Sequence, residues 1–140
     1  MMINNIFDPQ HLKYQAMGIG GLEVATGFAL LIFPELSYNF FFPGVSPSMV
    51  ELALMAWIGS FVAGVGLSYG AIMADATRAS LWFAPAVIRS LVGFYLLFAV
   101  IRGQLPIICL GISFYDIGLA GHHGLLMLKI KAHKGFGEVF

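Results

Sequence analysis

The sequence contains few charged residues. Only 10% of its 140 residues are charged and 59% are hydrophobic, and the mean hydropathy is +0.89. Soluble domains carry about 25% charged residues, and a soluble domain of this length buries only about two-thirds of its unfolded surface. The remaining apolar surface requires lipid as a second apolar solvent. We therefore expect an all-α integral membrane protein.

Net charge and cysteine are also scarce. Seven basic and seven acidic residues give a formal net charge of zero, so the chain lacks the basic surface that nucleic-acid binding requires. The one cysteine, Cys109, lies within an apolar run. A single cysteine excludes an intrachain disulfide and a thiolate metal cluster, and no metal site is predicted. We expect Cys109 to be a small buried apolar side chain.

Four apolar runs predict four transmembrane helices, at about residues 16–33, 49–73, 81–101 and 105–127. The first run corresponds to about 27 Å of helix, just enough to cross a bilayer. The segment 34–48 contains three prolines and several aromatic residues, which indicates an interfacial segment that does not span. We expect residues 1–140 to form one domain, an antiparallel up-and-down bundle of four helices.

Local signals refine these helices. Ser48 and Glu51 have the spacing of a capping box, Pro85 predicts a kink, and Pro106 is expected in the first turn of the fourth helix. Small residues recur at spacings of three, four and seven, which favours close helix packing in lipid. These small residues on the first, second and fourth helices are Gly18, Gly20, Gly21, Gly27, Ala56, Gly59, Ala63, Gly66, Gly70, Gly111, Gly118 and Gly121.

The basic residues predict the orientation in the membrane. Arg102 stands alone on one side, and the other basic residues beside the spans fall on the opposite side, where the positive-inside rule places the cytoplasm. They are Lys13, Arg78, Lys129, Lys131 and Lys134. We therefore expect both termini to be cytoplasmic, in a bacterial inner membrane or an equivalent membrane. No soluble domain is predicted, so any chemistry must occur in or beside the bilayer.

Three charged residues, Glu23, Arg89 and Asp116, fall inside the predicted spans. Each costs about 2.5–3.5 kcal/mol at the centre of a bilayer, so we expect them to face inward as one cluster in which Arg89 is shared by two carboxylates. His123 lies two turns from Asp116 on the same face and extends this polar cluster. One interpretation is that the cluster fixes helix order and rotation. The other is a site for the polar head of a quinone, sterol or lipid, or a proton relay.

His122 precedes His123 in the segment GHHG. Adjacent residues on a helix project about 100° apart, so they cannot supply opposite axial ligands to one haem iron, and haem within one chain is not expected. His122 is instead predicted to contact lipid head groups, a partner subunit or a pigment. The sequence identifies no cofactor.

Four segments carry a resemblance to a known family. They are GIGGLEVATGFALLIFP, GSFVAGVGLSYG, AVIRSLVGFYLL and FYDIGLAGHHGLLMLKIK, one for each predicted helix. This pattern resembles the DoxX-like four-helix membrane proteins over most of the chain. The resemblance implies a small subunit associated with quinone-linked or other membrane redox assemblies. It carries over no catalytic residue.

Three functions follow as hypotheses. The first is a non-catalytic accessory or assembly subunit of a larger membrane complex, with other subunits or further copies of the chain as partners. The second is an enzyme or binding protein for a quinone, sterol or other lipid-like ligand, with Glu23, Asp116 and His123 as acid or base groups. The third is a small transporter or proton pathway, which ranks last because the two halves show no repeat.

Overall fold

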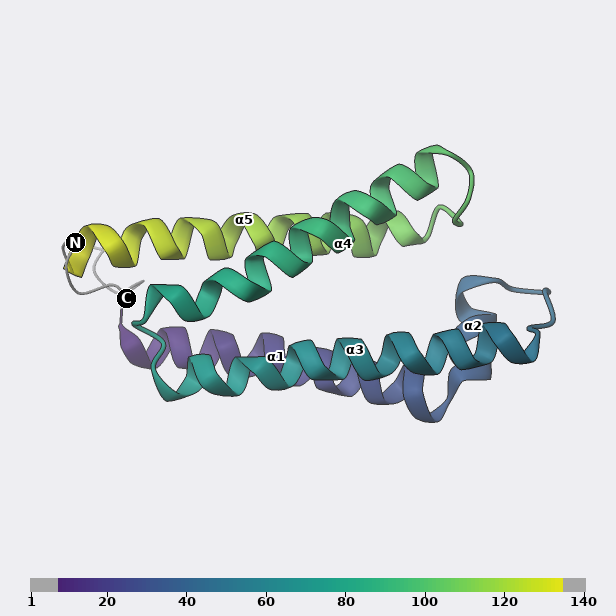
Figure 1. Cartoon of the computed structure of the whole chain (residues 1–140), viewed down its shortest axis with the longest axis horizontal. Helices are drawn as coiled ribbons and strands as arrows, with labels where there is room; N and C mark the ends of the chain where they lie inside the picture. The colour runs from purple at the N-terminus through teal and green to yellow at the C-terminus, as the bar shows by residue number, and fades with distance from the viewer. Residues whose placement is uncertain (1–7, 135–140) are drawn as a thin grey trace. The chain divides into compact units, whose positions relative to one another are not determined.

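The computed structural model describes residues 8–134, with side chains to residue 132, and this part of the chain is all-α with no strand (Figure 1). The long helices are α1 (Pro9–Ile32), α3 (Met49–Ala74), α4 (Phe83–Ile101) and α5 (Cys109–Lys134). Two short elements connect them: α2 (Pro34–Phe41) follows α1, and the 3-10 helix η2 (Ala79–Trp82) precedes α4.

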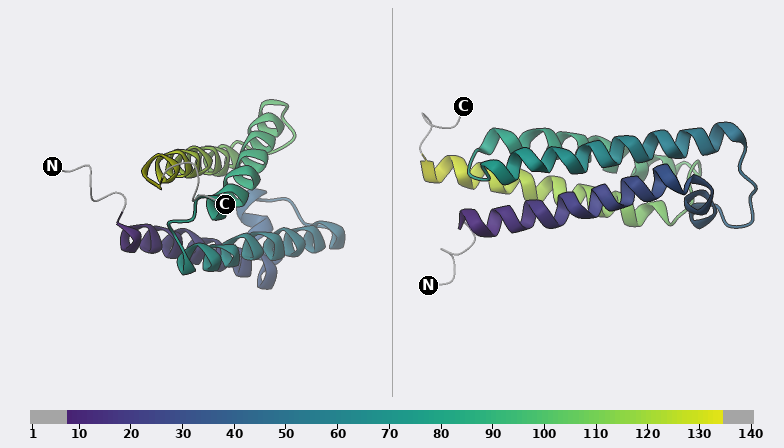
Figure 2. Two further views of the ribbon diagram at one scale, coloured as in Figure 1. Left: turned by 60° about the vertical axis from the view of Figure 1, so that its left-hand side comes forward. Right: turned by 90° about the horizontal axis from the view of Figure 1, so that it is seen from below.

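The described residues form two compact units, divided after residue 12 and again after residue 73. The N-terminal unit, residues 13–73, contains most of α1 together with α2 and α3, and α1 and α3 run antiparallel side by side (Figure 2). The C-terminal unit contains η2, α4 and α5, together with the first turn of α1. In it, α4 and α5 form an antiparallel helical hairpin.

Within residues 8–134, three segments are long and apolar enough to cross a membrane: Pro9–Ile32, Met49–Ala74 and Ala79–Ile101. They agree with three of the four expected spans and are compatible with an integral membrane protein. Helix α5 has sufficient length, at 26 residues. Its composition is more polar because it carries Asp116, His122 and His123 as well as a basic end. The fourth span and the four-helix bundle therefore stay predictions.

Two predicted helix boundaries are wrong. Helix α1 begins at Pro9 and not at residue 16, because Asp8 and Pro9 start the helix before the apolar run: Oδ1 of Asp8 accepts the Gln10 N–H at 3.0 Å, and proline is favoured in the first turn. Helix α5 begins at Cys109, so Pro106 lies before it, in a turn that the Cys109 N–H closes at 3.0 Å.

The C-terminal boundary of the fourth helix is also wrong. Helix α5 continues to Lys134, beyond the predicted end at residue 127. The apolar run ends near Leu128, and lysines continue the helix because they are good helix formers and are favoured near a helix C-terminus.

The predicted capping box at the start of α3 is confirmed. Oε2 of Glu51 accepts the Ser48 N–H at 2.6 Å and the Ser48 hydroxyl at 2.7 Å, and Ser48 Oγ accepts the Glu51 N–H at 3.3 Å. These bonds satisfy amides that the helix start would otherwise leave without a partner.

The hairpin turn begins with a helix-ending motif. Gly103 has φ of +69°, its N–H donates to Val100 O at 2.9 Å, and the Gln104 N–H donates to Ala99 O at 2.9 Å. This is the Schellman arrangement, in which a residue with positive φ lets the last carbonyls find donors. Gly103 therefore ends α4 and starts the chain's return toward α5.

Pro85 is the third residue of α4, directly after η2. The first turn of a helix has no intrahelical acceptors for its N–H groups, so proline fits there without breaking an intrahelical hydrogen bond. The loss of such a bond was the reason for predicting a kink at Pro85. The change from 3-10 to α geometry occurs before Pro85, at Phe83.

Small residues bring α1 and α3 into close contact, as predicted for these two helices. A Cβ added to Gly20 would lie 2.7 Å from Tyr69 Cβ, one on Gly59 would lie 2.6 Å from Gly27 O, and one on Gly27 would overlap the Ala63 backbone. Only hydrogen fits at these positions, and it lets the two backbones approach closely. At six other predicted positions an added Cβ would meet nothing within 4 Å: Gly18, Gly21, Gly70, Gly111, Gly118 and Gly121.

Candidate functional site

The buried face of α5 contains three of its polar side chains, Ser113, Asp116 and His123. Buried residues recur at spacings of three and four, which is one face of a helix: they are Cys109, Ser113, Asp116, Ala120, His123, Leu126 and Ile130. Large apolar side chains lie on the exposed part of the same helix, among them Phe114, Leu125 and Leu128, which are 58–65% exposed. As far as Leu128, α5 therefore buries polar side chains among apolar ones and exposes large apolar side chains, whereas a helix on a soluble protein exposes its polar face.

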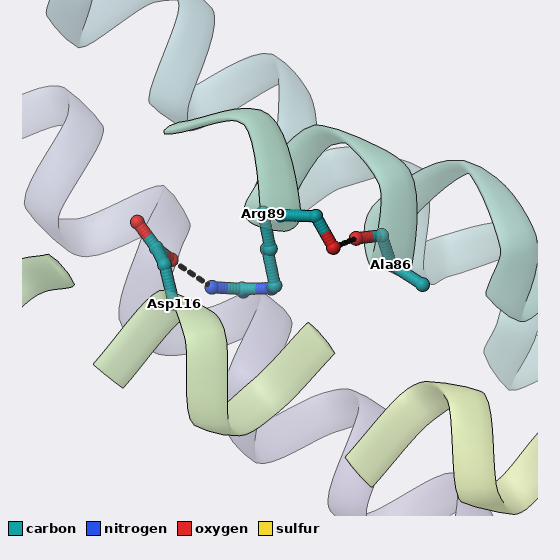
Figure 3. Close-up of polar contacts among 4 residues, drawn as sticks. Ala86, Arg89 and Asp116 are labelled. Atoms are coloured by element: carbon teal, nitrogen blue, oxygen red, sulfur yellow. Dashed lines mark hydrogen bonds and ion pairs between the residues drawn. The ribbon is translucent and has the colours of Figure 1, made fainter. Parts of the chain in front are cut away.

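Arg89 of α4 and Asp116 of α5 point toward each other across the hairpin (Figure 3). Nη1 of Arg89 donates to Oδ1 of Asp116 at 2.7 Å, and the Arg89 side chain is only 2% exposed. Burial of an ion is unfavourable unless an opposite charge and hydrogen bonds compensate it. The short contact supplies both, so this part of the hairpin has no net charge.

A second polar contact lies one helical turn from the ion pair. Ser113 Oγ donates to the Gly93 carbonyl at 2.8 Å, and Ser113 is fully buried. A Cβ added to Gly93 would lie 2.8 Å from Ile117 Cγ1 and 3.1 Å from the Ser113 carbonyl oxygen. The missing side chain at residue 93 therefore brings the helices close enough for this interhelical bond.

Tyr115 adds an aromatic contact to the ion pair. The Arg89 Cζ lies 5.5 Å from the centroid of the Tyr115 ring, within the range of a cation–π interaction. Tyr115 is 40% exposed, so its ring covers the guanidinium on one side while its other side faces outward. Sequence reasoning missed this contact, because Tyr115 carries no distinguishing pattern.

Trp82 and His123 form the inner part of the hairpin near the start of α4. Their ring centroids are 5.2 Å apart and both residues are fully buried. The Trp82 Nε1–H donates to the Ala76 carbonyl at 3.0 Å, which satisfies the one polar atom of the indole. Trp82 therefore joins the turn before η2 to α5. The His122 ring lies 6.0 Å from that of His123, and His122 is half-buried.

Glu23 lies in α1, within the N-terminal unit, and is buried at 8% exposure. It shares a face of α1 with Gly20 and Gly27, as expected from their spacing. The structure thus brings together Arg89 and Asp116 of the expected cluster, and the participation of Glu23 stays a prediction.

Tyr38 was not identified from the sequence as a partner of the capping box. Its hydroxyl donates to Glu51 Oε1 at 3.0 Å, so α2 is bonded to the first turn of α3. Burial of the ring and the hydrogen bond to the Glu51 carboxylate both raise the pKa of the Tyr38 phenol above its ordinary value. Glu51 thus has a double structural role, as cap and as acceptor for Tyr38.

The described residues contain no group of three or more histidine, cysteine, aspartate or glutamate side chains that could hold a metal ion. His122 and His123 are neighbours on one helix, and Asp116 is engaged with Arg89. The Arg89–Asp116 pair neutralises a buried charge and holds α4 and α5 in register.

No protein-family model, curated protein or solved structure matches the chain. The resemblance to DoxX-like proteins therefore stays a prediction.

Proposed function

We propose that the chain is a four-span integral membrane protein that serves as a non-catalytic accessory or assembly subunit of a larger membrane complex. The observation that carries this proposal is that the C-terminal unit buries polar side chains and exposes large apolar ones. Its buried Arg89 and Asp116 form an ion pair and its buried Ser113 hydroxyl donates to the Gly93 carbonyl, while many of its exposed residues are large and apolar. Such a surface suits contact with lipid or with other membrane helices.

The same distribution supports α5 as the fourth span. Its polar residues Ser113, Asp116 and His123 are buried, so they reduce the average hydropathy of the helix without facing lipid. Its outward face is apolar as far as Leu128. Polar residues in membrane helices face the protein interior, and α5 follows this rule. Four spans would place both termini on one side of the membrane, and the basic residues favour the cytoplasmic side of a bacterial inner membrane or its equivalent.

An accessory role is supported by what the buried charges do. A catalytic or proton-carrying pair needs a group that can exchange protons or contact a substrate, whereas Arg89 holds Asp116 in a short ion pair beneath Tyr115. The exposed side of α4 offers a broad aromatic and aliphatic surface to a partner. Its residues are Leu91, Phe94, Tyr95, Phe98 and Ile101, which are 56–73% exposed.

Photo-crosslinking tests this function. A benzophenone amino acid at Tyr95 on α4, or at Trp57 on α3, is expected to crosslink one discrete polypeptide in intact membranes. The chain is expected to migrate on native gels, after extraction in mild detergent, in a complex larger than its own micelle. Adducts with lipid alone at both positions, together with migration as a monomer, would contradict an accessory role.

A second candidate is a binding protein for a lipid-like molecule. A groove of about 370 Å³ lies between α1 and α3, within the size range of small-molecule sites. Its lining residues carry no polar side chain: they are Met17, Gly20, Gly21, Val24, Ala25, Gly66, Leu67, Gly70 and Met73. It would take an apolar chain or ring system, and Met17→Trp would fill it. Loss of a co-purifying lipid in that variant, detected by mass spectrometry, would favour this candidate over the first.

A further inference from the structure

Basic residues are concentrated at one end of the α4–α5 hairpin. Arg78 directly precedes η2, and Lys129 and Lys131 lie in the last turns of α5. Arg78 and Lys129 are exposed and Lys131 is half-buried. At the opposite end, the hairpin turn carries Arg102 as its basic residue. The hairpin is therefore electrically asymmetric along its length.

The Trp82–His123 contact establishes that these basic residues share one end. The two rings are 5.2 Å apart, so they mark the same level in two antiparallel helices. Arg78 lies four residues before Trp82, and Lys129 lies six residues after His123. Because the two helices run in opposite directions, the segment that precedes Trp82 and the segment that follows His123 extend toward the same end of the hairpin. In the loop before η2, Oδ1 of Asp75 accepts the Thr77 N–H at 3.2 Å and the Thr77 hydroxyl at 2.8 Å.

Large apolar side chains lie immediately beside the basic end. Leu125 is 58% exposed and Leu128 is 65% exposed, and Leu125 is four residues from Lys129, on the same face of α5. The exposed face therefore changes from apolar to cationic within one helical turn. A phospholipid has the matching order, with an acyl chain followed by a phosphate. Lysine and arginine beside a span attract anionic headgroups.

We infer that Arg78, Lys129 and Lys131 bind the headgroup of an anionic phospholipid whose acyl chain lies along Leu125 and Leu128. The phosphate accepts hydrogen bonds from the ammonium and guanidinium groups. This inference requires α5 to be embedded in the membrane, and it does not depend on a partner subunit. Inorganic phosphate would satisfy the charges and leave the leucines without a ligand, so the acyl chain distinguishes a lipid from a free anion.

Lipid retention by the purified full-length chain tests the inference. The detergent-solubilised protein is exposed to an equimolar mixture of phosphatidylglycerol and phosphatidylcholine with identical acyl chains, and bound lipids are counted by native mass spectrometry. Preferential retention of phosphatidylglycerol is expected. Lys129→Gln with Lys131→Gln should lower that preference about fivefold per residue. The matched variant Arg102→Gln, at the opposite end, should leave it unchanged.

A second set of measurements separates the lipid from a free anion. Leu125→Asn with Leu128→Asn keeps every basic residue, and it should reduce retention of phosphatidylglycerol if the acyl chain contributes. Millimolar inorganic phosphate should displace little lipid. Equal retention of both lipids, an unaffected lysine variant, or complete displacement by phosphate would overturn the inference. A chain that retains phosphatidylglycerol but migrates as a monomer would overturn only the accessory function.

Discussion

Nη1 of Arg89 lies 2.7 Å from Oδ1 of Asp116, and this ion pair joins α4 to α5 inside their hairpin. Each residue alone would place an uncompensated charge in a buried environment, because Arg89 is 2% exposed and Asp116 is 8% exposed. The two charges cancel only when the helices are in the observed register. The pair therefore favours one rotation and one vertical alignment of the two helices over the others.

Removing one partner of this pair should destabilise the protein more than removing both. Arg89→Leu leaves Asp116 buried without its cation, and a loss of about 3–5 kcal/mol is expected. In Arg89→Leu with Asp116→Leu, most of this loss should be recovered because no charge remains. Stability can be measured by reversible unfolding of the purified protein in mixed detergent micelles. A fully stable Arg89→Leu variant that had lost a bound ligand would instead indicate a binding site.

Glycine substitutions should have opposite effects at two positions of α1. Gly27→Ala would place a methyl group against the Ala63 backbone, which cannot move aside as a side chain can, so a loss of about 1–3 kcal/mol is expected. Gly18 has no neighbouring atom within 4 Å of an added Cβ. Gly18→Ala should therefore be neutral or stabilising by up to about 1 kcal/mol. The same unfolding assay compares them, and equal losses would contradict close packing of α1 on α3.

The bond between Tyr38 and Glu51 predicts a pH dependence at high pH. Because burial and the Glu51 carboxylate raise the pKa of Tyr38, its stabilising effect should be complete below the ordinary tyrosine pKa of about 10. It should be lost as pH rises through the higher folded pKa. Ultraviolet titration of tyrosinate, with Tyr38→Phe as the reference, isolates this phenol. Glu51→Gln should lower its pKa, and a Tyr38 component that titrates at the ordinary value in the wild type would contradict the contact.

Features that depend on residues close together in the sequence could be predicted from the sequence alone. Ser48 and Glu51 are three residues apart, so their capping box follows from local geometry alone. The cost of burying a charge in lipid indicated that Arg89 and Asp116 need partners, and the structure brings these two together. Glu23 carries the same cost, but its partner depends on how distant segments of the chain pack, which local spacing does not determine.

Other features required the folded chain. The Trp82–His123 contact joins residues that are 41 positions apart, and its register depends on the hairpin turn. Tyr38 reaches Glu51 across a turn in which Gly44 has φ of +81°. The start of α1 and the end of α5 were wrong because hydropathy locates the apolar part of a helix, whereas Pro9 and Lys134 lie in polar extensions of these helices.

The membrane topology can be decided at α5. If α5 spans, residue 132 lies on the same side as residue 77 and opposite residue 104; if only the three most apolar helices span, residue 132 lies with residue 104. Cys109 is the single cysteine, so Cys109→Ser provides a background for Thr77→Cys, Gln104→Cys and Ala132→Cys. A membrane-impermeant maleimide applied to right-side-out and inverted vesicles reports the side of each. We expect Thr77→Cys and Ala132→Cys to react in inverted vesicles and Gln104→Cys in right-side-out vesicles. The reason is that α5 buries Ser113, Asp116 and His123, while its large exposed side chains as far as Leu128 are apolar.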